Sequence, residues 1–135
     1  MAQLDFHNIN ESEKKLPHTH THTHTLPIIQ RFVSVYKLWD EFKNHLPKKS
    51  KYALGTKIEL CFLDILELLF ISGSLSKEQK LPLLYKASGK LNLLKFFLQI
   101  AWELKNIDNK KYIMLSEHLN EIGKMLGGWI KGLQK

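Results

Sequence analysis

The chain has 135 residues, with 20 Lys and Arg against 13 Asp and Glu, which gives a net charge of +7 with histidine neutral. This length suits one domain with one hydrophobic core and is short for two. No run reaches the roughly 18 apolar residues of a membrane span, one cysteine excludes an intramolecular disulfide framework, and no secretory signal is predicted, so we expect a cytoplasmic protein without a membrane partner.

Residues 1–26 are polar, lack helical periodicity and include the His-Thr repeat of residues 18–25. This pattern predicts a flexible leader, followed by a folded domain over residues 27–135. The alternating histidines could bind zinc, nickel or copper, but nothing nearby fixes a geometry, so genetic or engineered low complexity is the preferred interpretation. The positive charge belongs to the domain, because residues 27–135 hold 18 basic and 10 acidic residues.

Proline and glycine signals predict the first two helices. Pro27 favours a helix start, and Pro47 ends that helix. Ser50 is the expected N-cap of a second helix that Gly73 terminates. The first apolar stripe consists of Ile28, Phe32, Val35, Trp39, Phe42 and Leu46, and the second of Leu54, Ile58, Cys61, Phe62, Ile65, Leu68 and Leu69. Cys61 is expected to be a buried small hydrophobe rather than a nucleophile.

The third helix is predicted from about Lys77 or Leu81 to Lys105, with Pro82 in its first turn. Gly89 in its middle predicts close contact with another helix.

The fourth helix is expected to begin at Asp108 or Asn109 as the cap. Its apolar residues are Met114, Leu115, Leu119, Ile122, Met125, Leu126, Trp129, Ile130 and Leu133. Short links between four long helices predict an all-α, antiparallel up-down-up-down four-helix bundle.

The third helix has more apolar surface than one core requires, when its residues are placed at about 100° intervals. Its core arc consists of Leu84, Ala87, Leu91, Leu94, Leu98, Ala101 and Trp102, and a second strip consists of Leu93, Phe97, Ile100 and Leu104. Because contiguous exposed apolar surface usually marks an interface, this strip predicts a homo-oligomer. Scattered exposed leucines on a long bundle are the alternative interpretation.

Lysines supply the candidate partner-binding residues, and many lie near the predicted turns. The set is Lys48, Lys49, Lys51, Lys57, Lys86, Lys90, Lys95, Lys110 and Lys111. The turns before the second and fourth helices fall at the same end of an up-down bundle, so that end should be positively charged. Oligomerisation would multiply this charge and give avidity for a phosphate backbone. Each cluster taken singly is equally consistent with solvated turns.

Catalytic and metal-binding patterns are not recognised in the sequence. Glu117 and His118 are adjacent rather than spaced as in a di-iron bundle, and Glu67 has no histidine three residues later. No P-loop, zinc motif or Ser-His-Asp arrangement is recognised either. We therefore expect no enzymatic activity, no catalytic residue, no cofactor and no metal.

Three segments resemble a known family: "LPKKSKYALGTKIELCFLDILELLFISG", "KLPLLYKASGKLNLLKFFLQIAWELKNI" and "LSEHLNEIGKMLGGWIKGL". They are similar to the four-helix-bundle family that includes the accessory variability determinant (Avd) of diversity-generating retroelements and the large-subunit ribosomal RNA intervening-sequence proteins. The resemblance implies a basic homopentameric ring that binds a reverse transcriptase and template RNA, with DNA as a further candidate partner, and that supports mutagenic cDNA synthesis. The alternative is a structural homo-oligomer of the intervening-sequence type without a dedicated nucleic-acid role.

Overall fold

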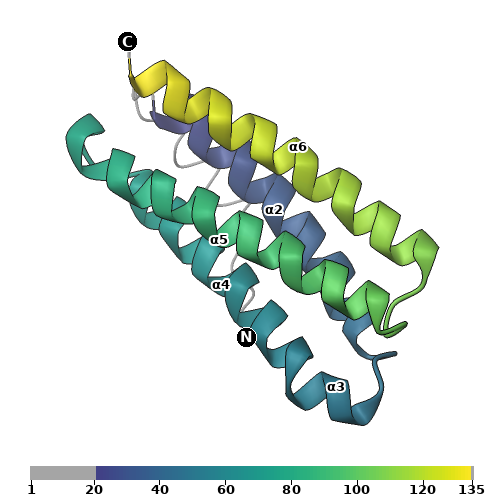
Figure 1. Cartoon of the computed structure of the whole chain (residues 1–135). Helices are drawn as coiled ribbons and strands as arrows, with labels where there is room; N and C mark the ends of the chain where they lie inside the picture. Colours follow the sequence, from purple (N-terminus) through teal and green to yellow (C-terminus); the bar gives the residue numbers. More distant parts are fainter. Residues whose placement is uncertain (1–20, 135) are drawn as a thin grey trace.

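The computed structural model describes the backbone of residues 21–134 and the side chains of residues 26–134, and no strand occurs there. The four long helices are α2 (Thr21–Lys43), α4 (Leu54–Ser72), α5 (Lys77–Glu103) and α6 (Asn109–Leu133), and a short helix, α3 (Lys48–Tyr52), precedes α4. The long helices run side by side and alternate in direction (Figure 1). α2 and α5 each pack against both α4 and α6, which closes an antiparallel bundle around one core. The predicted all-α class is confirmed for these residues.

The start of α2 differs from the prediction. The helix begins at Thr21 rather than at Pro27, and Pro27 lies inside it. Proline has no backbone N–H, so the carbonyl one turn earlier receives no hydrogen bond from this residue. Residues 1–20, most of the predicted leader, lie outside the described residues.

The predicted second helix is divided into α3 and α4. Ser50 lies inside α3 instead of capping a helix, and the backbone breaks at Ala53 with φ −111° and ψ −82°. The break lets the connection fold back onto Gly55, where a Cβ atom would lie 3.2 Å from Leu46 Cδ1 and 3.4 Å from the Ser50 carbonyl oxygen. Close approach of the connection therefore explains the glycine at this position. α4 ends before Gly73 as predicted.

The start of α5 is defined by a capping box. The Ser76 side chain accepts a hydrogen bond from the Gln79 N–H, and the Gln79 side chain accepts one from the Ser76 N–H. With this start, Pro82 lies in the second turn and not in the first. The prediction for Gly89 is wrong, because this residue is exposed and a Cβ there would have no atom within 4 Å.

The core matches most of the predicted stripes. Every residue of the first stripe is buried, and the Phe62 ring packs against Phe32 and Trp39 with centroid distances of 5.4 and 6.1 Å. Cys61 is also buried, and this burial raises the pKa of its thiol. Asp108 caps α6, since its side chain accepts a hydrogen bond from the Lys111 N–H at 2.8 Å.

Two residues of α5 depart from the predicted core. Trp102 is 37% exposed, stacks on Tyr112 at a centroid distance of 4.8 Å, and donates from Nε1 to Asn109 Oδ1. It lies in the last turn of α5, where the connection to α6 replaces a packed helix face. Lys80 was not predicted in the core but is 2% exposed, with Nζ 5.6 Å from the centroid of the Trp129 ring.

Candidate nucleic-acid interface

The connection between α2 and α4 presents three lysines on or beside a short helix. Pro47 precedes α3 and has no N–H to satisfy, which suits the start of a helix. Lys48 and Lys49 are exposed and Lys51 is half-buried. Within residues 26–134 none of the three forms an ion pair. Their charge is therefore available to an external anion.

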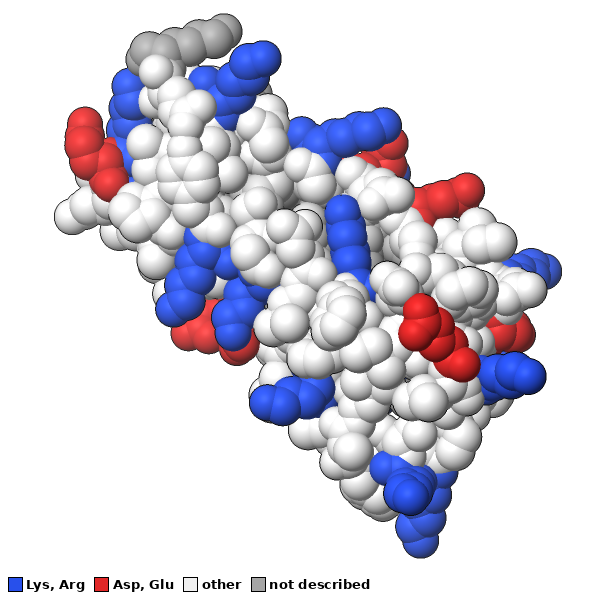
Figure 2. All heavy atoms as spheres, viewed as in Figure 1, with Lys and Arg blue, Asp and Glu red and all other residues white. Residues whose placement is uncertain are grey.

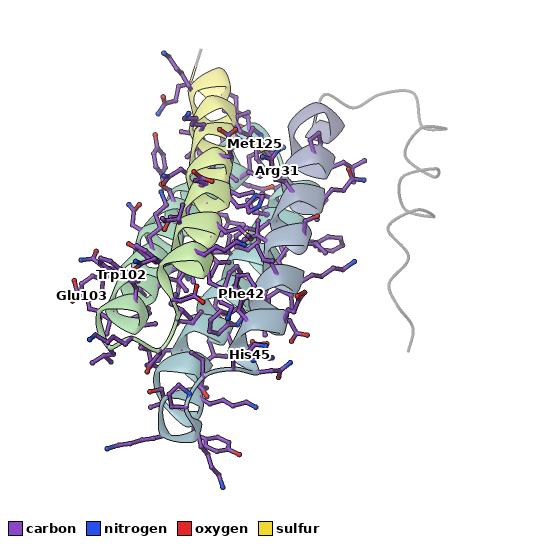
Figure 3. The ribbon with its side chains drawn as sticks, turned by 90° about the vertical axis from the view of Figure 1, so that its right-hand side faces the viewer. Arg31, Phe42, His45, Trp102, Glu103 and Met125 are labelled. Carbon is purple, nitrogen blue, oxygen red and sulfur yellow. The ribbon has the colours of Figure 1, made fainter. Side chains whose placement is uncertain are left out.

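The α5–α6 connection brings further lysines to the same end of the bundle. Lys111 Nζ lies 5.6 Å from the centroid of the Phe42 ring, which belongs to the end of α2. Figure 3 shows Phe42 near this end, with His45 beyond it towards the connection to α3. The structure thus places Lys110 and Lys111 at the end of the bundle that holds Lys48 and its neighbours, as predicted.

Asp108 neutralises part of this second cluster. Its carboxylate lies 3.6 Å from Lys111 Nζ, and the pKa of Asp108 is lowered chiefly by the hydrogen bond from the Lys111 backbone N–H and also by the charges of Lys111 and Lys110. Lys110 is exposed and forms no ion pair within the described residues. We call Lys48, Lys49, Lys51, Lys110 and Lys111 the basic end. Figure 2 shows Lys and Arg side chains projecting from the lower tip of the molecule, where α3 lies in Figure 1.

The other predicted lysines are distributed along the long helices. Lys57 is exposed on α4, and Lys86 is exposed on α5. Lys90 Nζ pairs with Asp64 Oδ2 at 3.1 Å across α4 and α5. Lys95 is half-buried, and its Nζ would lie 3.6 Å from a Cβ at Gly123 of α6. These four residues do not extend the basic end into one continuous cluster.

A hollow of about 310 Å³ lies beside the basic end. Its lining residues are Lys43, Lys51, Tyr52, Gly55, Thr56, Glu59 and Leu60. The Tyr52 ring at its margin is 72% exposed. Sequence reasoning did not identify this feature, because the hollow depends on the break at Ala53, which no residue pattern indicated.

Glu59 joins α4 to α2 at the inner side of this hollow. Its carboxylate accepts hydrogen bonds from the Tyr36 hydroxyl, from Trp39 Nε1 at 3.0 Å and from Lys43 Nζ at 3.1 Å. Burial alone would raise the pKa of Glu59, but the hydrogen bonds from Tyr36, Lys43 and Trp39 outweigh it and lower the pKa. Burial, followed by the bond to Glu59, raises the pKa of Tyr36 to about 12. Asp40, through its hydrogen bond, is the main cause of the raised pKa of Lys43.

The predicted apolar strip on α5 is only partly exposed. Leu93 and Leu104 are 39% and 61% exposed, whereas Phe97 and Ile100 are half-buried, and Phe97 packs against the core. The exposed aromatic residue is the neighbouring Phe96, at 54%. Phe97 packs inward and Phe96 does not, because consecutive helix residues are about 100° apart and Phe97 lies about a quarter of a turn nearer to the core side. The strip therefore shifts by one residue at this position.

α4 contributes apolar surface that the predicted strip did not include. It packs against α5, and four of its large apolar side chains are exposed. We define the apolar face as Leu60, Leu63, Phe70 and Ile71 of α4 with Leu93, Phe96 and Leu104 of α5. In the sequence, α4 has an almost unbroken apolar run. This run contains more apolar residues than one core-facing stripe requires.

The part of the chain that the structure describes contains neither a metal-ligand cluster nor a membrane-spanning helix. No group of three or more His, Cys, Asp and Glu residues there is arranged to hold a metal ion. No helix in that part is both long and apolar enough to cross a membrane. The His-Thr repeat lies where side chains are not described, so the preferred interpretation of the repeat as low complexity is not tested.

Comparison with known protein families identifies a relationship. A family model described as bAvd-like matches residues 26–133, which covers all four long helices apart from the first turns of α2. No curated protein matches the chain.

Proposed function

The chain belongs to the bAvd-like family, and on that premise we propose that it is a non-enzymatic accessory protein of a diversity-generating retroelement. In this role it binds template RNA together with the reverse transcriptase and supports mutagenic cDNA synthesis, with DNA as a second candidate nucleic acid. The observation that supports nucleic-acid binding most directly is the basic end, where two turns distant in sequence lie together.

Exposed lysines without acidic partners are suited to a phosphate backbone. Lys48, Lys49 and Lys110 are exposed and form no ion pair among the described residues. Each lysine that neutralises a phosphate releases condensed counterions, and this release favours binding at low salt. Such contacts do not distinguish base sequences. The proposed binding is therefore electrostatic and only weakly selective for sequence.

Self-association would increase this affinity. The apolar face has seven large side chains exposed to 39% or more on two adjacent helices, which supports an interface between copies of the chain. We propose that this face joins subunits, in a pentameric ring of the kind that the family resemblance implies. Several basic ends in one assembly would bind one RNA strand with avidity.

The first experiment measures RNA affinity as a function of salt concentration. The test variant is Lys48→Gln with Lys49→Gln and Lys51→Gln, and the control is Arg31→Gln with Lys124→Gln and Lys131→Gln. Both sets remove three positive charges, but the control residues lie away from the basic end, with Arg31 in the middle of α2 and Lys124 and Lys131 in the second half of α6. We expect the first variant to lose affinity and to reduce the salt slope by about 0.7 per lost contact on single-stranded RNA. Equal losses in both variants would refute the basic end as the binding site.

The second experiment is co-purification of the full chain with a reverse transcriptase encoded beside its gene and with that element's RNA. A stable complex would support the accessory role. A chain that assembles but binds neither RNA nor a reverse transcriptase would instead fit the structural homo-oligomer of the intervening-sequence type, an alternative that the apolar face alone supports.

A further inference from the structure

Tyr52 is exposed to an extent that the fold does not explain. Its side chain is 72% exposed, more than any other exposed large apolar or aromatic side chain among the described residues. Within those residues the ring has no aromatic contact and the hydroxyl has no hydrogen bond. A ring in this position contributes little to the hydrophobic core, so stability of the monomer does not explain an aromatic residue here.

The position of Tyr52 is nevertheless fixed by its neighbours. The Thr56 hydroxyl lies 3.3 Å from the Tyr52 carbonyl oxygen and 3.4 Å from that of Lys51, and donates to this pair. The connection also packs closely on Gly55. A side chain at this position would displace Leu46. Tyr52 therefore projects from an anchored helix end.

The lining of the hollow beside Tyr52 carries a small net positive charge, because it holds two lysines and one glutamate. Lys43 is balanced by Glu59 at 3.1 Å and by Asp40 at 2.9 Å. The remaining lining residues include Lys51, the small Gly55 and the apolar Leu60. Lys51 is the lining lysine without an acidic partner among the described residues, and Lys48, Lys49 and Lys57 add positive charge outside the hollow. This arrangement suits an occupant with an uncharged planar group and negatively charged flanking groups.

We propose that Tyr52 and the adjacent hollow bind one unpaired nucleobase of single-stranded RNA, while the flanking phosphates contact Lys48, Lys49 and Lys51. This inference rests on the proposed function, because it requires that the chain bind RNA. The hollow of about 310 Å³ is large enough for one base with part of its ribose. An exposed aromatic ring stacks on any base face, but a duplex keeps those faces paired and stacked. The site therefore distinguishes single strands from duplexes without reading sequence.

The test compares Tyr52→Ala with Tyr52→Trp and with Tyr85→Ala in the full chain. Tyr85 is a matched control, because its ring is 51% exposed near the start of α5, at the opposite end of the bundle. Affinity is measured by fluorescence anisotropy for a single-stranded oligouridylate and for an RNA duplex of equal length, at one salt concentration. We expect Tyr52→Ala to weaken single-strand binding by roughly tenfold and to leave duplex binding unchanged, because stacking on one base is lost. Tyr52→Trp should retain single-strand binding, and Tyr85→Ala should behave as the unmodified chain.

The outcomes separate this inference from the proposed function. If the unmodified chain binds single-stranded RNA and Tyr52→Ala binds it equally well, the nucleobase site is refuted and the proposed function stands. If the unmodified chain binds neither RNA, the proposed function fails and this inference fails with it. Retained RNA binding with loss of reverse-transcriptase co-purification in Tyr52→Ala would assign the hollow to a protein partner and overturn the inference.

A second measurement does not depend on the stability of a variant. The unmodified chain is irradiated with an oligonucleotide that contains 5-bromouridine, and the crosslinked residue is identified by mass spectrometry. We expect a crosslink at Tyr52. Crosslinks confined to other aromatic residues, such as Trp102, would overturn the proposed site.

Discussion

The two pairs of adjacent helices present opposite kinds of surface. The outward side chains of α4 and α5 include the seven residues of the apolar face, whereas those of α2 and α6 are almost entirely polar, charged or glycine. Ile113 is the one large apolar side chain that is exposed on the described parts of α2 and α6. All four helices bury comparable inward stripes, so the core does not explain the difference. The proposed assembly accounts for the difference, because it would place the α4–α5 side against another subunit and leave the α2–α6 side in water.

The strongest test of this comparison places a charge on each side. Phe96→Glu changes the apolar face, and Ile113→Glu changes α6, and both side chains are 54% exposed. We expect Phe96→Glu to weaken self-association by at least about tenfold, because burial of one large apolar side chain contributes about 1.5–3 kcal/mol. Ile113→Glu should leave it unchanged. Sedimentation velocity over a dilution series measures both, and a reversed result would exchange the roles of the two sides.

The junction between the two sides at α2 and α4 depends on Glu59. We expect Glu59→Gln to lower the free energy of unfolding by about 2 kcal/mol at pH 7, since a charged acceptor with three donors is lost. Because the pKa of Glu59 is lowered from its ordinary value of 4.5, the contribution is complete above that pH and is lost as pH falls through the native pKa. Urea unfolding from pH 7 to pH 3 should show the difference shrinking. A difference that stays constant would assign the effect to neutral hydrogen bonding.

The junction between α5 and α6 contains the buried Lys80, whose charge the fold accommodates at a cost. Burial lowers the pKa of Lys80 from its ordinary value of 10.5. We expect Lys80→Met to raise the free energy of unfolding by about 1 kcal/mol at pH 7, because an apolar side chain replaces a buried cation. Because the pKa of Lys80 is lower in the native state than in the unfolded state, the native lysine loses its proton first as pH rises. The free energy of unfolding of the unmodified chain therefore increases with pH, and the stability advantage of Lys80→Met decreases towards pH 10.5.

The control for this experiment is Lys86→Met, at an exposed position of the same helix. It should change the free energy of unfolding by less than about 0.5 kcal/mol. A loss of stability in Lys80→Met would show that the contact between the ammonium and the Trp129 ring contributes more than the burial costs.

The smallest effect is expected on the α4–α5 side itself. The pair between Lys90 and Asp64 has side chains that are 33% and 43% exposed. We expect Asp64→Asn to cost less than about 1 kcal/mol, and added salt to remove most of this cost. Thermal unfolding at low and high salt measures it. A cost as large as that of Glu59→Gln would mean that the polar contacts of α4 with α5 contribute as much stability as those of α4 with α2.

Core positions were predictable where helical periodicity is regular. Each apolar residue of the first stripe is buried, and the cap at Asp108 follows from its side chain. Lys80 was missed because its charge suggested the surface, although it precedes Leu84 by four residues and Ala87 by seven and so lies on their face. Trp102 was misplaced because periodicity does not show where the neighbouring helix ends.

The candidate site was predictable only in its charges. The lysines before the second and fourth helices are visible in the sequence, and antiparallel topology places them at one end. The hollow beside Tyr52 was not predictable, because it depends on the backbone break at Ala53 and on the close approach of the connection to Gly55. Both are tertiary features that local propensity does not encode. The exposed side of α4 could have been identified by the same helical placement that was applied to the third helix.

The single cysteine of the chain is an intrinsic probe of local opening of the bundle. Cys61 is 4% exposed on α4, and burial disfavours the thiolate that reacts with alkylating reagents. The rate of its modification therefore reports how often α4 separates from the helices that pack against it, and the reaction needs no introduced label. If the α4–α5 side is covered in an assembly, the modification rate of Cys61 will fall as protein concentration rises. The same cysteine would then report both local unfolding and subunit exchange.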